Sequence, residues 1–292
     1  MSVTTAQRYS ELAKSQNEPE LIEHLPSGGS VGWFGSKSAK KVLAYIPGGG
    51  LVTYASGAQI QMAYDAYKTA LAAAGNVALA ILSYDICAVA EYPSQLCQTV
   101  SFVESLMKDH DPEDIDLFGE SAGGMLIISM LLHVSHNHPK VPSLTMPVGR
   151  KFHRALLISP GGPVKTSASS MTGNDGKDGL TTATLSALWA MIEANHDPEV
   201  DLVNPWLTPT LKMFETWYEN WPIGEISIII GDDEILRDDI IQVANVIKGK
   251  HSAEVDVHVY PKSGHCAIVG EIMRQAPLSE YSLAVYEWAK KI

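Results

Sequence analysis

The chain has 292 residues, which is long enough for one large α/β domain or for such a domain with an embedded lid. Hydrophobic residues make up 46% of it and charged residues 18%, a balance typical of globular rather than disordered proteins. The net charge of −12 argues against nucleic acid or an anionic membrane surface as the main partner, because both repel a negatively charged protein.

Short β-branched or apolar runs alternate with longer stretches of helical periodicity, and this alternation is typical of a parallel sheet covered by helices on both faces. The predicted strands are residues 41–46, 76–83, 115–118, 155–159, 225–230 and 254–260. The predicted helices are residues 59–74, 93–109, 122–133, 238–248 and 279–291. The sequence therefore predicts an α/β fold with a mainly parallel sheet.

Two segments fall outside this alternation. Residues 1–30 are polar and contain one weakly helical segment, whereas residues 161–222 begin rich in Ser, Thr and Gly and then hold four of the six tryptophans. Open α/β sheets bind ligands at the carboxyl ends of their strands, so an insertion there is well placed to form a lid. We expect one domain over residues 1–292, with both segments forming a cap. Trp189, Trp206 and Trp217 would either contact substrate or pack the insertion onto the core.

The amino-terminal residues lack the basic and apolar regions of a secretory signal, and three scattered cysteines are too few for a disulfide framework. Both features favour a cytoplasmic location. The longest apolar run, near residues 125–132, is far shorter than the roughly 20 residues of a membrane-spanning helix. His133, His136 and His138 lie in a polar stretch, and we expect a solvated loop there rather than a metal site.

The motif Gly119-Glu120-Ser121-Ala122-Gly123 follows a predicted strand and immediately precedes a predicted helix. In that setting a G-x-S-x-G motif indicates a sharp turn that exposes a nucleophilic serine. Small neighbours are needed because the turn strains the backbone and brings other backbone segments close. The start of the helix also favours a developing oxyanion. Ser121 is therefore the candidate nucleophile.

A serine needs a neighbouring general base, and the usual chain order in this arrangement is serine, acid, histidine. His265 has the best setting of the ten histidines, in a turn between the last predicted strand and the terminal helix. The acid must then lie after residues 226–230, where five carboxylates crowd into residues 232–239. The residue pattern alone leaves Asp233 and Glu234 as alternatives.

The chain resembles the hormone-sensitive-lipase-like carboxylesterases of the α/β-hydrolase fold, especially their fungal members. Four sequence blocks and His265 carry the resemblance: Tyr45-Ile46-Pro47-Gly48-Gly49-Gly50, Glu91-Tyr92-Pro93-Ser94-Gln95-Leu96, Gly119-Glu120-Ser121-Ala122-Gly123-Gly124 and Glu234-Ile235-Leu236-Arg237-Asp238-Asp239. This family usually shows Asp-Pro-Leu-Arg-Asp at the acid block. The match therefore places Glu234, one methylene longer than the usual aspartate, on the family's acid.

The family's His-Gly-Gly-Gly motif reads Pro47-Gly48-Gly49-Gly50 in this chain. The resemblance assigns the oxyanion hole to the backbone N–H groups of Gly49, Gly50 and Ala122, which survive the change. Proline replaces an imidazole that usually anchors this loop. We expect the replacement to shift the loop and to alter efficiency or substrate choice.

Together these features predict a serine hydrolase that cleaves a carboxylic ester of a small to medium apolar substrate through an acyl-enzyme, with no metal or organic cofactor. Alternatives with the same three side chains are acyl transfer, lactone processing and a non-hydrolytic step of natural-product biosynthesis, where fungal relatives often act. A non-catalytic ligand receptor is a further alternative. The resemblance also implies a monomer or a homodimer.

Overall fold

The computed structural model describes residues 3–162 and 166–292. Its centre is an eight-stranded sheet in the order β1-β2-β4-β3-β5-β6-β7-β8. The two amino-terminal strands are antiparallel to their neighbours, and the other six run parallel to one another. The strands are β1 (Ile22–His24), β2 (Ser30–Phe34), β3 (Lys41–Ile46), β4 (Val77–Ser83), β5 (Ile115–Glu120), β6 (Phe152–Ile158), β7 (Ile223–Gly231) and β8 (Glu254–Tyr260).

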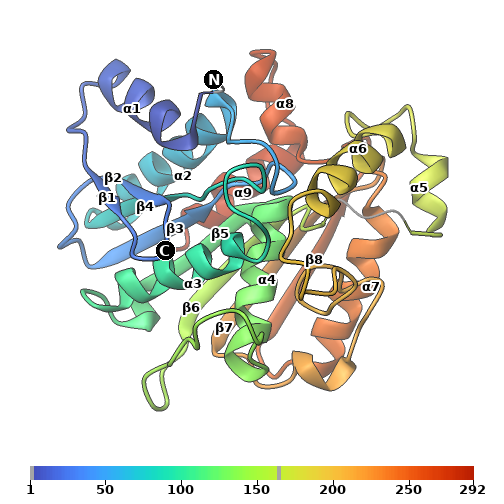
Figure 1. Ribbon diagram of the computed structural model, residues 1–292. Coiled ribbons are helices and arrows are strands. Elements are labelled where there is room, and N and C mark those ends of the chain that lie inside the picture. The colour runs from blue at the N-terminus through green and yellow to red at the C-terminus, as the bar shows by residue number, and fades with distance from the viewer. Residues whose placement is uncertain (1–2, 163–165) are drawn as a thin grey trace.

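Helices cover both faces of this sheet (Figure 1). One face packs against α1, α2, α8 and α9, and the other against α3, α4 and α7. The helices are α1 (Thr5–Ser15), α2 (Gly57–Ala74), α3 (Ser94–Met107), α4 (Ala122–Ser135), α5 (Ser169–Gly173), α6 (Thr182–Glu193), α7 (Arg237–Lys250), α8 (Ala267–Met273) and α9 (Glu280–Ala289), with 3₁₀ turns η1 (Pro112–Asp114) and η2 (Glu215–Tyr218). The predicted α/β class is confirmed.

The central strands are apolar at consecutive positions because each face of the sheet is buried under helices. In β3, Leu43 and Tyr45 point into one core while Ala44 and Ile46 point into the other. All four side chains are inaccessible to solvent. The sheet is therefore fixed on both sides, and the loops at its carboxyl edge stand on a rigid base.

The sequence prediction missed β1, β2 and α8. The first two are short and antiparallel, and they lie in or beside the polar segment 1–30. Contrary to the expectation that this segment forms part of a cap, α1 packs on the sheet: the Tyr9 ring lies 4.9 Å from that of Phe34, and its hydroxyl donates to the carbonyl of Trp33. The buried face of α1 thus extends the core.

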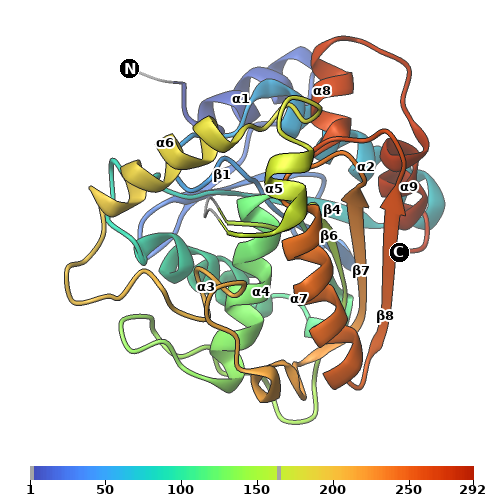
Figure 2. The ribbon, with the colours of Figure 1, turned by 90° about the vertical axis from the view of Figure 1, so that its right-hand side faces the viewer.

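The described part of the insertion 161–222, unlike α1, lies beyond one edge of the sheet. Figure 2 shows α5 and α6 beyond the ends of the strands toward which the arrowheads of β7 and β8 point. This is the carboxyl edge of the parallel strands, where α/β sheets bind ligands. Among the helices of the described chain, none is both long and apolar enough to cross a membrane.

The expectation of a solvated loop at His133, His136 and His138 is wrong for two of the three residues. His133 lies within α4, and both His133 and His138 are buried. The Nδ1 atom of His133 accepts a hydrogen bond from the N–H of His138, and the Nδ1 atom of His138 accepts one from the N–H of Lys140. Both rings must therefore be neutral, and they fasten the chain that leaves α4.

Burial lowers the pKa of His138 to about 4, with a smaller contribution from His133. An unfolded histidine takes up its proton below about pH 6.5, whereas the folded state resists protonation down to about pH 4, so stability is lost as the pH falls through this window. We expect His138 to account for about 3 kcal/mol of the loss. Urea unfolding at several pH values checks this: His138→Asn should flatten the dependence, and His24→Asn, on an exposed histidine, should not. Equal slopes in both variants would contradict it.

Candidate active site

Ser121 stands at the turn between β5 and α4, where it is the residue that precedes the first turn of the helix. Its backbone has φ 53° and ψ −125°, a conformation that L-residues rarely adopt. The N–H of Ser121 donates to the carbonyl of Ile158 at 2.9 Å, which holds the strained turn against β6. The side chain is only partly buried and lines a cavity. The sharp turn thus presents the hydroxyl at the carboxyl edge of the sheet.

The glycine two residues after the serine is required by close backbone packing. A Cβ atom at Gly123 would lie 1.9 Å from the carbonyl oxygen of Ile46, at the end of β3. Any side chain there would push β3 and the start of α4 apart. The small residues of the motif therefore serve the approach of two backbone segments.

The structure brings Ser121, His265 and Glu234 together. His265 follows β8, and its Nε2 atom lies 2.8 Å from the Ser121 Oγ atom. Its Nδ1 atom lies 2.8 Å from a carboxylate oxygen of Glu234, which follows β7. Three loops at the same edge of the sheet thus form one hydrogen-bonded chain from hydroxyl to carboxylate.

Geometry distinguishes the two acids that the sequence left as alternatives. The Glu234 side chain is fully buried, and its second oxygen accepts from the N–H of Gly231 at 2.7 Å and from the Ser159 hydroxyl at 3.2 Å. The Asp233 carboxylate is partly exposed and lies 4.0 Å from the Lys177 ammonium. Glu234 is therefore the carboxylate that meets His265, and its extra methylene is accommodated without loss of the hydrogen bond.

Burial of the ring disfavours the charged form of His265, yet the pKa of His265 is raised above its ordinary value. Burial also raises the pKa of the adjacent Cys266 thiol, so that group stays protonated and uncharged near neutral pH. The Glu234 carboxylate at Nδ1 is then the negative charge that raises the pKa of His265. This is the electrostatic role expected of an acid beside a general base.

The pH dependence of ester hydrolysis tests this electrostatic coupling. A general base works only when unprotonated, so kcat/KM should rise with pH through the pKa of His265, at a value above about 6.5. Glu234→Gln removes the negative charge, and we expect it to shift this limb to lower pH and to reduce kcat by about 10³- to 10⁴-fold.

Asp233→Asn is the matched control, because it removes a neighbouring carboxylate that does not contact His265. It should leave the pH position of the limb unchanged and keep kcat within about twofold of that of the original chain. A control variant that lost as much activity as Glu234→Gln would contradict the assignment of Glu234.

The loop after β3 carries two of the expected oxyanion donors. Gly49 has φ +123° and Gly50 has φ +60°, and a Cβ atom at Gly49 would lie 2.3 Å from the carbonyl oxygen of Thr53. Both glycines line the same cavity as Ser121. Within residues 3–162 and 166–292, no acceptor takes a hydrogen bond from the N–H of Gly49, Gly50 or Ala122. These groups are therefore unengaged by the protein.

A buried carboxylate holds this loop in place of the missing histidine. One Glu120 oxygen accepts from the N–H of Gly48 at 2.6 Å and from the Gln59 side-chain amide, and the other accepts from the Tyr45 hydroxyl at 2.8 Å. Burial raises the pKa of Glu120 against the opposing effect of these donors. The sequence analysis missed this role, although Glu120 lies inside the serine motif.

The cavity that contains Ser121 and His265 has a volume of about 370 Å³. Its apolar wall is mainly aliphatic, and much of it comes from the insertion: Leu180, Leu185 and Leu188 line it together with Leu236 and Val269. The sequence analysis did not single out these leucines. They lie in and just before α6, at spacings that place them on one face of that helix.

The three tryptophans expected at the substrate do not line this cavity. The Trp206 ring packs 4.9 Å from His138, and Trp217 stacks on His136 at 4.2 Å. Trp189, in α6, is partly buried and packs against the core. These positions favour the alternative role of packing the insertion onto the domain. The rings of Trp206 and Trp217 contact the chain that follows the carboxyl end of α4.

Among the residues that the structure describes, no group of three or more His, Cys, Asp or Glu side chains is arranged to hold a metal ion. The polar groups of the cavity are instead arranged around the Ser121 hydroxyl.

A family model described as alpha/beta hydrolase fold matches residues 43–269. The chain belongs to this family. Its solved structural relatives include an esterase/lipase from an uncultured bacterium, with a TM-score of 0.71 and 18% identity over 100% of this chain and 91% of that one. An esterase from the bacterial hormone-sensitive lipase (HSL) family has a TM-score of 0.70 and 20% identity over 98% of this chain and 90% of that one. At these identities the likeness shows a shared fold.

A curated relative, steryl acetyl hydrolase 1 from Saccharomyces cerevisiae (strain ATCC 204508 / S288c), is 24% identical over 148 residues. The match covers 50% of this chain and 34% of that relative. The chain thus matches about a third of the length of this relative.

Proposed function

We propose that this α/β hydrolase is a carboxylesterase-like serine hydrolase, of the hormone-sensitive-lipase-like branch, that cleaves esters through an acyl-enzyme. The observation that carries the proposal is the hydrogen-bonded chain from the Ser121 hydroxyl through His265 to Glu234, opening into an apolar cavity. Esterases and lipases among the structural relatives and a yeast acetyl hydrolase among the sequence relatives support it. The yeast relative supports the fungal character suggested by the sequence blocks.

In this mechanism Ser121 attacks the ester carbonyl while His265 takes the hydroxyl proton at Nε2. Glu234 holds the ring through Nδ1 and stabilises the imidazolium that forms. His265 then returns the proton to the leaving alcohol, and the acyl group stays on Ser121. Water, deprotonated by the same histidine, hydrolyses this acyl-enzyme and restores the serine.

The N–H groups of Gly49, Gly50 and Ala122 would donate hydrogen bonds to the carbonyl oxygen as its negative charge develops. Their lack of a partner within the described protein leaves them available to an oxyanion, and the start of α4 adds favourable electrostatics. Glu120 substitutes for the missing histidine by fixing the N–H of Gly48 at the entrance to this loop.

Replacement of the nucleophile is the most direct test. Ser121→Ala should lower kcat for p-nitrophenyl ester hydrolysis by at least about 10³-fold, because the covalent step is lost while binding remains. A fluorophosphonate probe should label the original chain and not this variant. Ser135→Ala, on an exposed serine of the same helix, is the control and should keep both labelling and rate. Full turnover by Ser121→Ala would overturn the proposed function.

The cavity supports an apolar substrate of small to medium size. Its volume of about 370 Å³ lies at the lower end of the range typical of small-molecule sites. The aliphatic wall from α6 and the preceding segment offers dispersion and hydrophobic contacts but few hydrogen-bond partners. Specificity for the acyl or alcohol group would therefore come from shape.

A series of p-nitrophenyl esters of graded acyl length tests the role of this wall. We expect kcat/KM to rise by about fourfold per added methylene until the cavity is filled, and to fall beyond that length. Leu188→Trp should move the optimum to a shorter chain, whereas Leu211→Trp, on an exposed leucine of the same insertion, should not. An optimum that is identical in all three proteins would show that acyl chains bind elsewhere.

Acyl transfer, lactone processing and a non-hydrolytic biosynthetic step use the same three side chains, and product analysis with and without an acceptor alcohol or amine separates them from hydrolysis. A non-catalytic ligand receptor would leave Ser121 unlabelled by the phosphonate probe. No feature of the cavity favours any of these over ester hydrolysis.

A further inference from the structure

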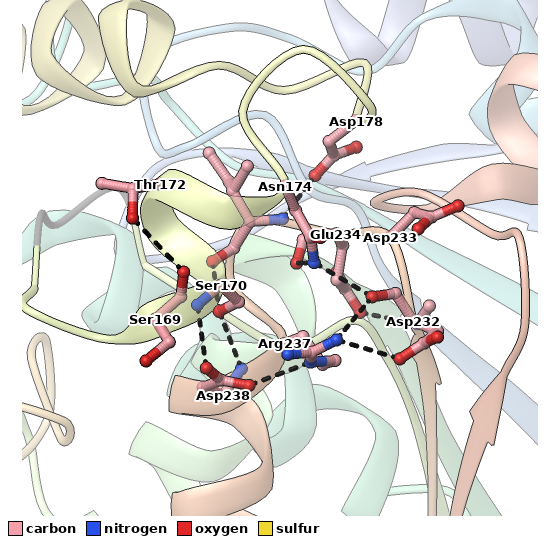
Figure 3. Close-up of polar contacts among 12 residues, drawn as sticks. Ser169, Ser170, Thr172, Asn174, Asp178, Asp232, Asp233, Glu234, Arg237 and Asp238 are labelled. Carbon is pink, nitrogen blue, oxygen red and sulfur yellow. Dashed lines mark hydrogen bonds and ion pairs between the residues drawn. The ribbon is translucent and has the colours of Figure 1, made fainter.

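Residues of the insertion hydrogen-bond to the loop that carries Glu234 (Figure 3). The side-chain amide of Asn174 donates to the carbonyls of Asp232 and Glu234, both at 3.0 Å. The Ser170 hydroxyl donates to the carbonyl of Ile235 at 2.9 Å. Residues of α5 and the turn after it therefore fix the backbone on both sides of the acid.

Asp178 links the insertion to the loop that carries His265 as well. One of its carboxylate oxygens accepts from the N–H of His265 at 2.7 Å, and the other accepts from the N–H of Ile235 at 2.9 Å. The residue is only 7% exposed. A single carboxylate thus bridges the loop after β7 and the loop after β8, and each bond lands at or next to a residue of the catalytic chain.

The Asp178 carboxylate has no cationic partner in the described part of the chain. The neighbouring Lys177 instead lies near Asp233 and donates to Asn174. A buried carboxylate without a counter-ion carries a desolvation cost, which hydrogen bonds from backbone N–H groups offset. Both of these hydrogen bonds go to the loops that carry Glu234 and His265, so the compensation depends on the relative placement of the two loops.

We propose that Asp178 is a positioning residue, which sets the distance between His265 and Glu234 by holding the backbones of both loops at once. The inference rests on the proposed function, in which the Nδ1–carboxylate bond orients the general base. If the bridge is lost, the two loops can separate and this bond lengthens. Misplacement of a catalytic group by about 1 Å is enough to cost about 10²-fold in rate.

Asp178→Asn is the informative variant because it keeps the size of the side chain. An amide has one acceptor oxygen and an NH₂ group, so one of the two backbone N–H groups would face a donor instead of an acceptor. Asp175→Asn is the matched control: it removes the same charge from an exposed position in the same turn, where the only donor to the carboxylate among the described residues is Thr182. Asp178→Glu retains both acceptor oxygens and tests rescue.

Rates are measured per active site, counted by complete titration with a fluorophosphonate, so that a misfolded fraction does not lower kcat. We expect Asp178→Asn to lower kcat by about 10- to 100-fold with little change in KM. It should also move the acidic limb of kcat/KM to lower pH and shift the low-field proton resonance of the His265 Nδ1–H group. Asp175→Asn should change none of these, and Asp178→Glu should recover part of kcat.

A purely structural role predicts a lower melting temperature with an unchanged kcat per titrated site and an unchanged pH limb, and that result would overturn the proposal. If Asp178→Asn does not fold, the test uses Asp178→Glu and the unmodified chain. Rapid amide hydrogen exchange at the N–H groups of His265 and Ile235 in the folded, unmodified chain would also refute the bridge. The resonance and the exchange rates do not require turnover. An inactive original chain would therefore count against the proposed function and leave the positioning role separately measurable.

Discussion

The burial of the Glu234 carboxylate is the constraint on which the site depends. A charge removed from water must be met by donors, and this one has three: the N–H of Gly231, the Ser159 hydroxyl and the His265 ring. Each donor comes from a different strand or the loop after it. The carboxylate therefore fixes the ends of β6 and β7 and the loop after β8 in one arrangement, and the ring it holds reaches Ser121.

A second buried carboxylate works on the opposite side of the serine. Glu120 accepts a hydrogen bond from the N–H of Gly48, which ties the glycine loop to the end of β5, the strand that Ser121 directly follows. The loop is thereby held although proline stands at position 47, where the resemblance leads us to expect an imidazole. The hydrogen bond from the N–H of Gly48 to Glu120, the residue directly before Ser121, opposes the expected shift of the loop.

The sequence predicted the parts of the molecule in which local pattern and burial agree. Strands β3 to β6 are buried on both faces, so their apolar runs were visible, and the serine motif lay between a clear strand and a clear helix. Strands β1 and β2 were missed because they are short and lie in or beside a polar segment. Asp233 and Glu234 could not be separated without the register at the end of β7, which decides the direction of each side chain.

The insertion shows why composition was a poor guide to the site. Its tryptophans attracted the prediction of substrate contact, but Trp206 and Trp217 pack near His136 and His138, at the end of α4 farthest from Ser121. The leucines of α6 line the cavity, and small polar residues of the insertion reach the loops that carry Glu234 and His265.

Each of these contacts joins residues far apart in sequence, and Asp178 lies 87 positions from His265. Such pairings have no periodicity to reveal them. They are set by the way the insertion folds back over the carboxyl edge of the sheet, so an insertion that resembles a simple cover in the sequence also supports the geometry beneath it.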